Sequence, residues 1–460
     1  MPSSHLARPT DQSSRPTTNH RSVWAPVHLG ELTDQIPAEI VDKALQATGT
    51  HQIRVRQLPS RVIVYFVLAL ALFPDLGYQL VYAKLGRAAG ALATISASAL
   101  SQARRRIGVQ PLQWIFQLLR GPAATIHRPS SWFGPYRVCA LDGTILTLPD
   151  TPAILGKYIR QAGHHGGTGY PQARVLALIA CGTRSILDAV FGPTSSGETT
   201  YTRELLPSMG PGMIILADRN FAAAALLKQI AATGAQYLVR VKNGRHLPVH
   251  QRLPDRSYLS MLAGTPVRVI TARISLHTTT GQTRQDYTLI TTVLDPQHGT
   301  SHELIRLYHE RWEVESTFKE LKSTLLTGKV LRSRTIALVE QEIYALLIIE
   351  QLLRTAMSEA TNADPAIDPD RASFKIALST ARDMILLGPA TERPPGVSGW
   401  TRLAGTIGQH VLANLVPQRR LRTGPRTVKR AISKYQARSS KPHGPTLPAQ
   451  LHIQITTRTG

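Results

Sequence analysis

The sequence predicts an α/β protein that begins with a helical domain and carries a β-rich insertion and a basic C-terminal region. Three observations predict this class. Apolar residues with helical spacing dominate the chain up to about residue 125, strand-like and helical segments alternate from about residue 136, and helical spacing resumes near residue 301. The chain has 460 residues, of which 42% are hydrophobic, so two or three domains with sizeable cores are expected.

The N-terminal part divides into a polar tail and a helical domain. Residues 1–28 are rich in Ser, Thr and Pro, and we expect them to be disordered. Helices are predicted to start at "LTDQIPAEIVDKALQATG", where Pro37 suits a first helical position and Gly49 a helix end. The apolar run at 62–73 is too short to span a bilayer and predicts a buried helix. We therefore expect residues 29–125 to form a compact all-helical domain.

The central part of the chain is predicted to be the α/β core. "RVCALDGTILTLPDTP" predicts a strand, a tight connection and a second strand, and two more strands are expected around a turn at Gly182. "GMIILADRNF" predicts a strongly apolar strand that ends on Asp218. Short alternating stretches then predict a β-rich insertion. The predicted division is a core in two parts at 130–242 and 301–360, the insertion at 243–300 and a C-terminal region at 361–460.

The net charge of +24 and the isoelectric point near 10.6 indicate a polyanionic partner, most simply nucleic acid. Twelve Lys or Arg residues and no acidic residue lie between Arg393 and Gly460. The densest part of this tail is expected to add sequence-independent affinity for DNA with a strong salt dependence. Its candidate DNA contacts are Arg419, Arg420, Arg422, Lys429 and Arg430.

A second basic cluster ends the short helix predicted at 96–108. Arg104, Arg105 and Arg106 are candidates for phosphate or base contacts. The alternative is that they form a solvated helix face, and the sequence leaves both interpretations open.

The cysteines and the N-terminus indicate a cytoplasmic protein. Cys139 and Cys181 lie in apolar runs and look like core residues, so we expect no disulfide framework and a reducing compartment. The first twenty residues contain no apolar segment of the kind found in signal peptides, and no contact with a membrane is expected. No His or Cys cluster has the spacing of a zinc site.

The segment "LYHERWEVESTFKELK" at 307–322 is predicted to be an amphipathic helix. At about 100° per residue, four side chains fall within roughly 60° of one another beside an apolar stripe: Tyr308, Arg311, Glu315 and Lys322. The alternative is a surface helix with pairs such as Arg311 and Glu315, each worth only about 0.3–0.5 kcal/mol. The other acidic residues of the segment are expected to be ordinary surface charges: Glu310, Glu313 and Glu320.

Two more carboxylates follow apolar, strand-like runs. Asp142 lies in "VCALDGT" and Asp218 ends "MIILAD". Polar residues at strand ends of α/β sheets face the crevice where ligands bind. Taken alone, Asp142 could cap a turn and Asp218 could cap a helix that starts near Phe221. Together with Glu315 they form a set of hard oxygen donors, which select Mg²⁺ or Mn²⁺ and can hold two ions about 3.5–4 Å apart for attack on a phosphodiester.

The spacing from Tyr308 through Arg311 and Glu315 to Lys322 resembles the Tyr-Arg-Glu-Lys signature of DDE transposases of the insertion-sequence-four family. "LDGTILTLPDTP" and "LADRNF" resemble the segments around the first and second Asp of that family, and "LTDQIPAEIVDKALQATG" resembles part of its N-terminal domain. The resemblance covers about residues 29–435. It implies a ribonuclease-H-like catalytic core whose third carboxylate arrives on a late helix, after a β-rich insertion.

The resemblance also implies an activity and its residues. Asp142, Asp218 and Glu315 would be the metal-binding triad for two Mg²⁺ (or Mn²⁺) ions, and phosphates beside the scissile bond would be held by Tyr308, Arg311 and Lys322. The chain would be a bacterial, nucleoid-associated enzyme that cuts an insertion sequence out of double-stranded DNA and joins it to target DNA. The helical domain would recognise the terminal inverted repeats, and the protein would pair two ends as a homodimer.

One departure concerns an aromatic residue. Relatives can place a Trp in the insertion to stack on a flipped base, but this chain has no Trp between 132 and 312. Tyr287 is the candidate substitute, because base stacking tolerates any aromatic ring. The alternative is a cross-strand tyrosine of the sheet core, so the formation of a hairpin intermediate stays open.

Two other functions remain as alternatives. A catalytically inactive or repurposed relative would bind DNA through the helical domain and the basic tail but would lose a carboxylate. A ribonuclease-H-like nuclease would cut DNA without strand transfer and would yield no joined products.

Overall fold

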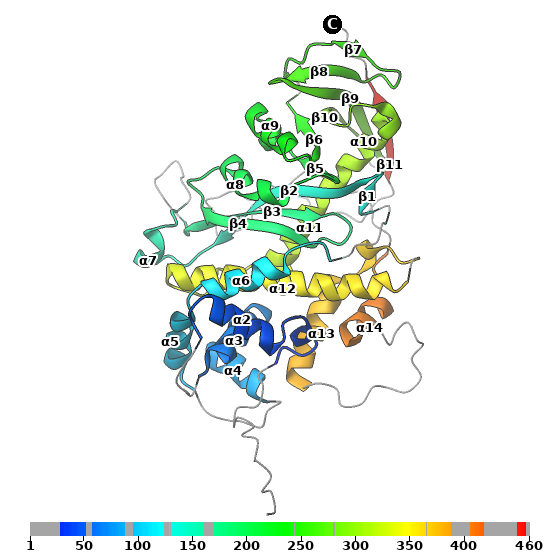
Figure 1. The fold of residues 1–460 in the computed structure, drawn as a ribbon. Helices are drawn as coiled ribbons and strands as arrows, with labels where there is room; N and C mark the ends of the chain where they lie inside the picture. Colours follow the sequence, from blue (N-terminus) through cyan, green and yellow to red (C-terminus); the bar gives the residue numbers. More distant parts are fainter. Residues whose placement is uncertain are drawn as a thin grey trace, which may run out of the picture.

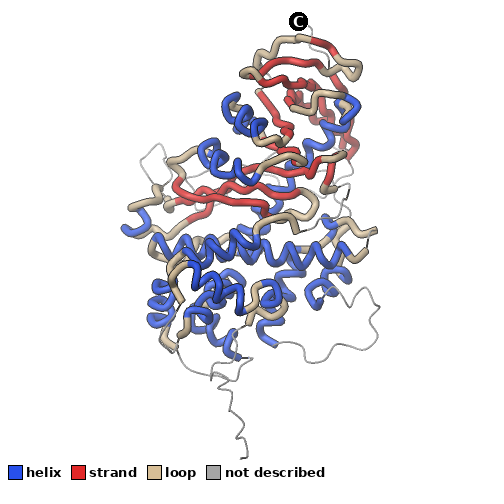
Figure 2. The backbone as a smooth tube through the Cα atoms, viewed as in Figure 1, coloured by secondary structure: helices blue, strands red, loops and turns tan. Residues whose placement is uncertain are grey.

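The computed structural model separates a helical part from a sheet (Figures 1 and 2). It describes residues 28–51, 58–87, 95–123, 128, 130–160, 169–242, 244–278, 281–364, 366–387, 405–417 and 449–456.

The N-terminal helices form one layer against the long helix α12 (Ile336–Asn362), as Figure 1 shows. Their apolar side chains explain this packing, since α3 is buried from Val62 to Leu72. The prediction of a helical N-terminal region is confirmed. Its members are α1 (Leu32–Gln35), α2 (Ala38–Ala47), α3 (Ser60–Leu72), α4 (Tyr78–Arg87), α5 (Ala97–Ile107) and α6 (Gln110–Leu119).

A mixed sheet follows, with the strand order β4-β3-β2-β5-β6-β10-β9-β8-β7. Strands β2, β5 and β6 are parallel, whereas β3 and β4 pair antiparallel beside β2. The elements of this part are β1 (Trp132–Phe133), β2 (Tyr136–Thr147), α7 (Pro152–Leu155), β3 (Gln172–Ala180), β4 (Ile186–Pro193), α8 (Glu198–Leu205), η1 (Leu206–Ser208), β5 (Met213–Ala217), η2 (Arg219–Phe221), α9 (Ala224–Ala232) and β6 (Gln236–Val241).

Strand β2 differs from the sequence-based prediction of two strands with a tight connection. It runs without a break, and both Asp142 and Thr144 pair with β3. Gly143 supports the strand rather than a turn. A Cβ atom at this position would lie 2.6 Å from Oε1 of Glu198 at the start of α8, so a larger residue would require the Glu198 side chain to move.

The strands at 251–291 extend the same sheet, because β10 pairs antiparallel with β6. Strand β9 pairs with β10 along one edge, and along the other edge first with β8 and then with β11. The last described strand of the chain therefore completes this edge of the sheet. The strands are β7 (Gln251–Arg252), β8 (Tyr258–Leu262), β9 (Thr265–Thr278), β10 (Gly281–Thr291) and β11 (Ala449–Ile455).

Helical structure returns at Ser301, as the sequence predicts, but it changes type along the chain. An α-helix, a 3₁₀ turn, a second α-helix and a π-helical turn precede α12. After η3 (Pro296–His298), these elements are α10 (Ser301–Tyr308), η4 (His309–Arg311), α11 (Trp312–Lys319) and η5 (Glu320–Leu325), and α12 is followed by η6 (Pro369–Arg371), α13 (Phe374–Leu387) and α14 (Gly405–Ala413). None of the helices in the described part of the chain is long and apolar enough to cross a membrane.

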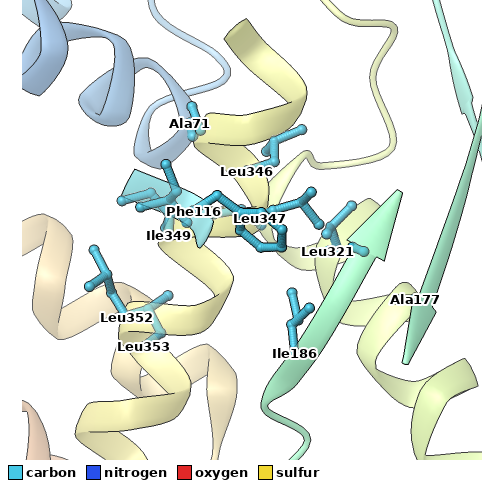
Figure 3. Packing of buried hydrophobic residues seen from close by; sticks show 14 of the residues in the cluster. Ala71, Phe116, Ala177, Ile186, Leu321, Leu346, Leu347, Ile349, Leu352 and Leu353 are labelled. Atoms are coloured by element: carbon cyan, nitrogen blue, oxygen red, sulfur yellow. The ribbon is translucent and has the colours of Figure 1, made fainter. Parts of the chain in front are cut away.

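Helix α12 joins the helical layer to the sheet, and it is buried as its apolar sequence predicts. Figure 3 shows its Leu346, Leu347 and Leu353 in one apolar cluster with Phe116 of α6 and Ile186 of β4. Apolar contact with both layers excludes water from one continuous core.

Buried polar side chains of α12 bind the ends of neighbouring elements. Gln351 is the clearest case. Its Oε1 accepts the backbone N–H of Ile186 at 2.7 Å, and its Nε2 donates to the carbonyls of Leu119 at 3.1 Å and Gly121 at 3.0 Å. One side chain thus satisfies backbone groups from the helical layer and from the sheet.

We predict that Gln351→Leu lowers the free energy of unfolding by about 2–4 kcal/mol, because three buried backbone groups lose their partner. Chemical denaturation monitored by circular dichroism would measure the change. The matched control is Gln46→Leu on the exposed side of α2, which should change stability by less than about 0.5 kcal/mol. A small effect at both positions would contradict the role given to Gln351.

Candidate active site

Two aspartates come together because β2 and β5 are parallel and in register. Leu141 pairs with Ala217, the last residue of β5, so Asp142 and Asp218 are the next residues on adjacent strands. Side chains alternate between the two faces of a sheet, which places both carboxylates on one face. This is the face that packs against α11. The prediction that both residues lie at strand ends holds for Asp218, whereas Asp142 lies within β2.

Asp218 also caps the 3₁₀ turn η2. Its Oδ1 accepts the backbone N–H of Asn220 at 2.7 Å, and the residue is half-buried. The capping predicted as an alternative for Asp218 is thus present, at the turn η2. Among the hydrogen bonds of the described residues, none involves Oδ2 of Asp218.

The third carboxylate, Glu315, lies on α11, the second α-helix after the insertion. The helical segment begins at α10, where Thr300 and Glu303 form a capping box. The uniform helix predicted for 307–322 is wrong, because a 3₁₀ turn interrupts it before Glu315 and a π-helical turn follows. These segments change the rotation per residue, so a single helical wheel does not describe the face.

Arg311 joins two of the carboxylates. Its Nη1 lies 3.4 Å from Oδ2 of Asp142 and its Nη2 lies 2.9 Å from Oε1 of Glu315. Arg311 is only 9% exposed. The pair between Arg311 and Glu315 was expected on the surface of a helix. Arg311 is instead buried and also contacts Asp142, so the pair lies at the edge of the core.

The pKa of Asp142 is raised to about 7 from an ordinary 3.8. Burial is the largest cause, and the negative charges of Asp218 and Glu315 add to it. Arg311 and the backbone N–H of Gly143 act in the opposite direction. The three carboxylates therefore interact electrostatically, and Arg311 is the cationic partner of Asp142 and Glu315.

The donors fit a divalent cation in their chemistry. All three are carboxylates, the hard ligands that Mg²⁺ and Mn²⁺ prefer. In the described part of the chain, no three His, Cys, Asp or Glu side chains are close enough to form a metal site as they stand. Arg311 lies between Asp142 and Glu315 in this arrangement.

The other residues of the signature lie around the carboxylates. Lys322 donates from Nζ to Oγ1 of Thr144, which lies two residues beyond Asp142 on β2, at 3.2 Å. Tyr308 is buried, and burial raises the pKa of its hydroxyl well above the ordinary value. The structure therefore places Tyr308 and Lys322 on the same side of β2 and β5 as the carboxylates.

Tyr287 lies beside this group although it comes from β10. Its ring contacts that of Tyr308 edge-on, with centroids 6.2 Å apart. The guanidinium of Arg240 lies 3.9 Å from the Tyr287 centroid, which is a cation–π contact. Tyr287 is half-buried and pairs across the sheet with Ala272. It is thus a cross-strand tyrosine and a neighbour of the site at once.

The basic residues predicted to contact DNA lie in different environments. The prediction that Arg104 contacts DNA is wrong, because Arg104 is fully buried. Its guanidinium donates to Gln341, Ser333 and the Leu338 carbonyl around α12. Two neighbours, Arg105 and Arg106, are exposed. The candidates in the basic tail lie outside the described residues: Arg419, Arg420, Arg422, Lys429 and Arg430.

The prediction that Glu313 is a surface charge is also wrong. Glu313 is fully buried and pairs with Arg184 at 2.7 Å. Glu320 is half-buried and also contacts Arg184. The helical wheel failed here because η4 and η5 shift the phase on either side of α11, and because Arg184 is distant in sequence.

Sequence reasoning also missed a basic depression beside Asp218. It has a volume of about 670 Å³ and is lined by Arg219, Ala222, Ala223, Lys242, Gly244 and Arg245. Arg219 directly follows Asp218, and Lys242 directly follows β6, so both lie at the same edge of the sheet as the carboxylates. The sequence signal that could have indicated this depression is the basic residue that follows the end of each of the strands β5 and β6.

We predict that the stability of the metal-free protein falls between about pH 4 and pH 7, partly because of Asp142. Its raised pKa means that the folded state keeps a proton that the unfolded state has lost, so stability is lost as pH rises through this window. Asp142→Asn removes this contribution, and its stability gain over wild type should grow to roughly 4 kcal/mol by pH 7 and then level off. Thermal unfolding in chelator would measure it, and a gap that is constant with pH would contradict it.

Two family models match the chain. One, described as "Insertion element 4 transposase N-terminal", matches residues 26–117, and the other, "Transposase DDE domain", matches residues 133–350. Transposase InsG for insertion sequence element IS4 of Escherichia coli (strain K12) is 26% identical over 432 residues, which cover 90% of this chain and 95% of that protein. Putative transposase InsZ of the same strain is 27% identical over 205 residues, 44% of this chain and 68% of that protein.

A cryo-EM structure of the piggyBac transposase synaptic complex with hairpin DNA aligns with a TM-score of 0.37 and 12% identity, over 80% of this chain and 85% of that chain. The family assignment rests instead on the two family models, which match the helical part and the sheet in chain order, and on the nearly full-length similarity to InsG. This chain belongs to the insertion-sequence-four family of DDE transposases and is a transposase enzyme.

Proposed function

We propose that the chain catalyses cut-and-paste transposition of an insertion sequence, with cleavage at the element ends followed by strand transfer into target DNA. The observation that carries this proposal is that three distant segments meet here: parallel strands place Asp142 beside Asp218, and Arg311 joins Asp142 to Glu315. A salt-bridged helix alone would not need two aspartates from β2 and β5 beside it.

The sheet supports a ribonuclease-H-like core for this chemistry. Three central parallel strands, β2, β5 and β6, are flanked by the antiparallel β3 and β4, and a helix after the insertion supplies the last carboxylate. We propose the core at 130–242 and 301–360, the insertion at 243–300 and the DNA-binding helical domain at 29–125. The tail at 1–28 and the C-terminal region at 361–460 complete this division.

The triad would hold two divalent cations, Mg²⁺ or Mn²⁺, which supply an activated attacking oxygen and neutralise charge on the phosphate when bound. The chain's own residues orient the reaction. Asp142 and Asp218 are fixed by strand register, whereas Glu315 is held on a helix. On binding, Arg311 would exchange its carboxylate contacts for the DNA phosphate, since guanidinium groups bind both kinds of oxygen.

Around this centre, neutral and positive donors would hold the DNA backbone. Burial keeps the hydroxyl of Tyr308 protonated, so it donates a hydrogen bond at neutral pH. Lys322 adds a positive charge beside β2. Tyr287 can stack on a base if one is flipped out, and its half-buried ring next to Tyr308 supports this role.

The DNA substrate is double-stranded and comprises the terminal inverted repeats and the target site. The charge of +24 supports a long polyanionic contact. Arg105 and Arg106 remain candidates on the exposed side of α5, together with the basic tail. A homodimer would pair the two ends.

We predict that Glu315→Gln lowers the rate of cleavage of a DNA duplex carrying the element's ends by at least about 1000-fold, because a metal ligand loses its charge. End binding without divalent ions should stay within about threefold of wild type. Gel assays of cleavage and of binding would measure the two effects. Glu310→Gln in the 3₁₀ turn η4 is the control on the same segment and should cleave within about tenfold of wild type.

Each alternative function has its own result in this assay. Unchanged cleavage by Glu315→Gln would exclude the proposed triad. Cleavage by wild type without joined products would favour a nuclease, and binding without cleavage would favour an inactive relative.

We further predict that the basic depression beside Asp218 contacts DNA phosphates. The double change Arg219→Ala and Lys242→Ala should weaken end binding about tenfold or more at moderate salt and should make the slope of log K against log salt shallower by roughly 2. Fluorescence anisotropy across a salt series would measure this. A double change at Arg252 and Arg256, beside the distant strand β7, is the matched control for net charge. Equal losses in both double variants would mean that only total charge matters.

A further inference from the structure

The side of α11 that carries Glu313 is held by a buried arginine from the turn between β3 and β4. Arg184 donates from Nε to Oε2 of Glu313 at 2.7 Å and from Nη1 to Oε1 of Glu320 at 3.2 Å. Its Nη2 lies 3.6 Å from Asp370 in η6. Two helical residues project about 200° apart, so Glu313 and Glu315 point to opposite sides of α11. Arg184 therefore contacts the side of α11 that faces away from Glu315, while Arg311 contacts Glu315 itself.

A second buried arginine continues this network into α12. Arg354 binds Glu320 and also Glu350, whose Oε1 lies 3.0 Å from Nη2. Arg354 and Glu350 are 1% and 0% exposed in their side chains. The network thus connects α11, η5 and α12 through charged groups rather than through apolar packing alone.

The backbone of Arg184 is unusual for a residue with a side chain. Its φ is +58°, in the left-handed region that glycine favours, within a turn that also contains Gly182. A non-glycine residue there costs on the order of 1 kcal/mol or more, so the position is held by its surroundings. The conformation places the guanidinium under α11, with a side chain that is only 13% exposed.

Burial of such a pair contributes little net stability compared with apolar residues of similar size, although loss of one partner is costly. Burial disfavours the charged form of Arg184, but Glu313, Glu320 and Asp370 outweigh this and raise its pKa. The pair of Arg184 and Glu313 is consequently charged, and its hydrogen bonds fix the relative position of the two side chains. Such a pair orients α11 more than it stabilises the fold.

We propose that Arg184 and Glu313 are a positioning pair that sets the rotation of α11 and thereby directs Glu315 at Asp142 and Asp218. This inference rests on the proposed function of Glu315. Neither member touches the reacting atoms. Their effect is on the rate of the chemical step and not on the affinity for DNA.

The test compares a single with a double substitution. Arg184→Met leaves Glu313 buried without its partner, and we expect a clear loss of stability. Arg184→Met with Glu313→Leu removes both charges and should recover part of this loss, because Glu320 keeps Arg354 and only the 3.6 Å contact of Arg184 with Asp370 stays lost. Leu353→Ala in the α12 core is the control for a general loss of stability.

Three quantities are measured on the full-length protein: the free energy of unfolding, the affinity for a DNA end without divalent ions, and the single-turnover cleavage rate. Backbone hydrogen exchange of residues 312–325 in the metal-free protein is the fourth. We expect the double variant to bind DNA within about threefold of wild type but to cleave at least about tenfold more slowly, with faster exchange in this segment. Leu353→Ala should not show this combination at temperatures where it is folded. Arg184→Lys keeps a positive charge beside Glu313, so it should cleave faster than Arg184→Met.

A double variant with wild-type stability, exchange and cleavage would overturn the proposal and leave the pair a structural contact. Faster exchange with an unchanged rate would also overturn it, because α11 would then not control the chemistry. Failure of the proposed function is recognised separately, since Glu315→Gln would cleave as fast as wild type in the same assay.

Discussion

The parallel pairing of β2 with β5 is the constraint on which the site depends. It brings Asp142 beside Asp218 on one face of the sheet, although the two residues are far apart in sequence. Two like charges beside each other oppose folding unless a cation offsets them, and burial increases the cost at Asp142. The position of Arg311 between Asp142 and Glu315 follows from this requirement.

Helix α12 extends this constraint to the N-terminal region. It packs against α3 and α6 on one side, and its Arg354 reaches Glu320 in the segment that carries Lys322. Figure 3 shows the apolar part of the same junction, where Phe116 of α6 and Ile186 of β4 share one cluster with residues of α12. A helical domain that contacts DNA would therefore be connected to the carboxylates through a rigid element and not through a flexible linker.

The sequence predicts the fold best where one local pattern decides the structure. The helical N-terminal region, the strand before Asp218 and the buried α12 all follow from periodicity and apolar content. Prediction fails where a distant partner decides. Glu313 looks like a surface charge until Arg184 is brought under it, and Arg104 looks like part of a basic face until Gln341 of α12 covers it. The change to 3₁₀ and π turns around α11 likewise depends on packing, which a helical wheel does not contain.

The pairing of β11 with β9 has a consequence for the synthesis of the chain. Strand β9 ends at Thr278, but the strand that covers its edge from Ala272 onward begins at Ala449. On a ribosome, the neighbours β8 and β10 emerge early, while this part of the edge stays open for about 170 residues. Tertiary structure that depends on such distant segments forms late. The sheet beside Tyr287 is thus finished only after every carboxylate of the proposed triad has already been made.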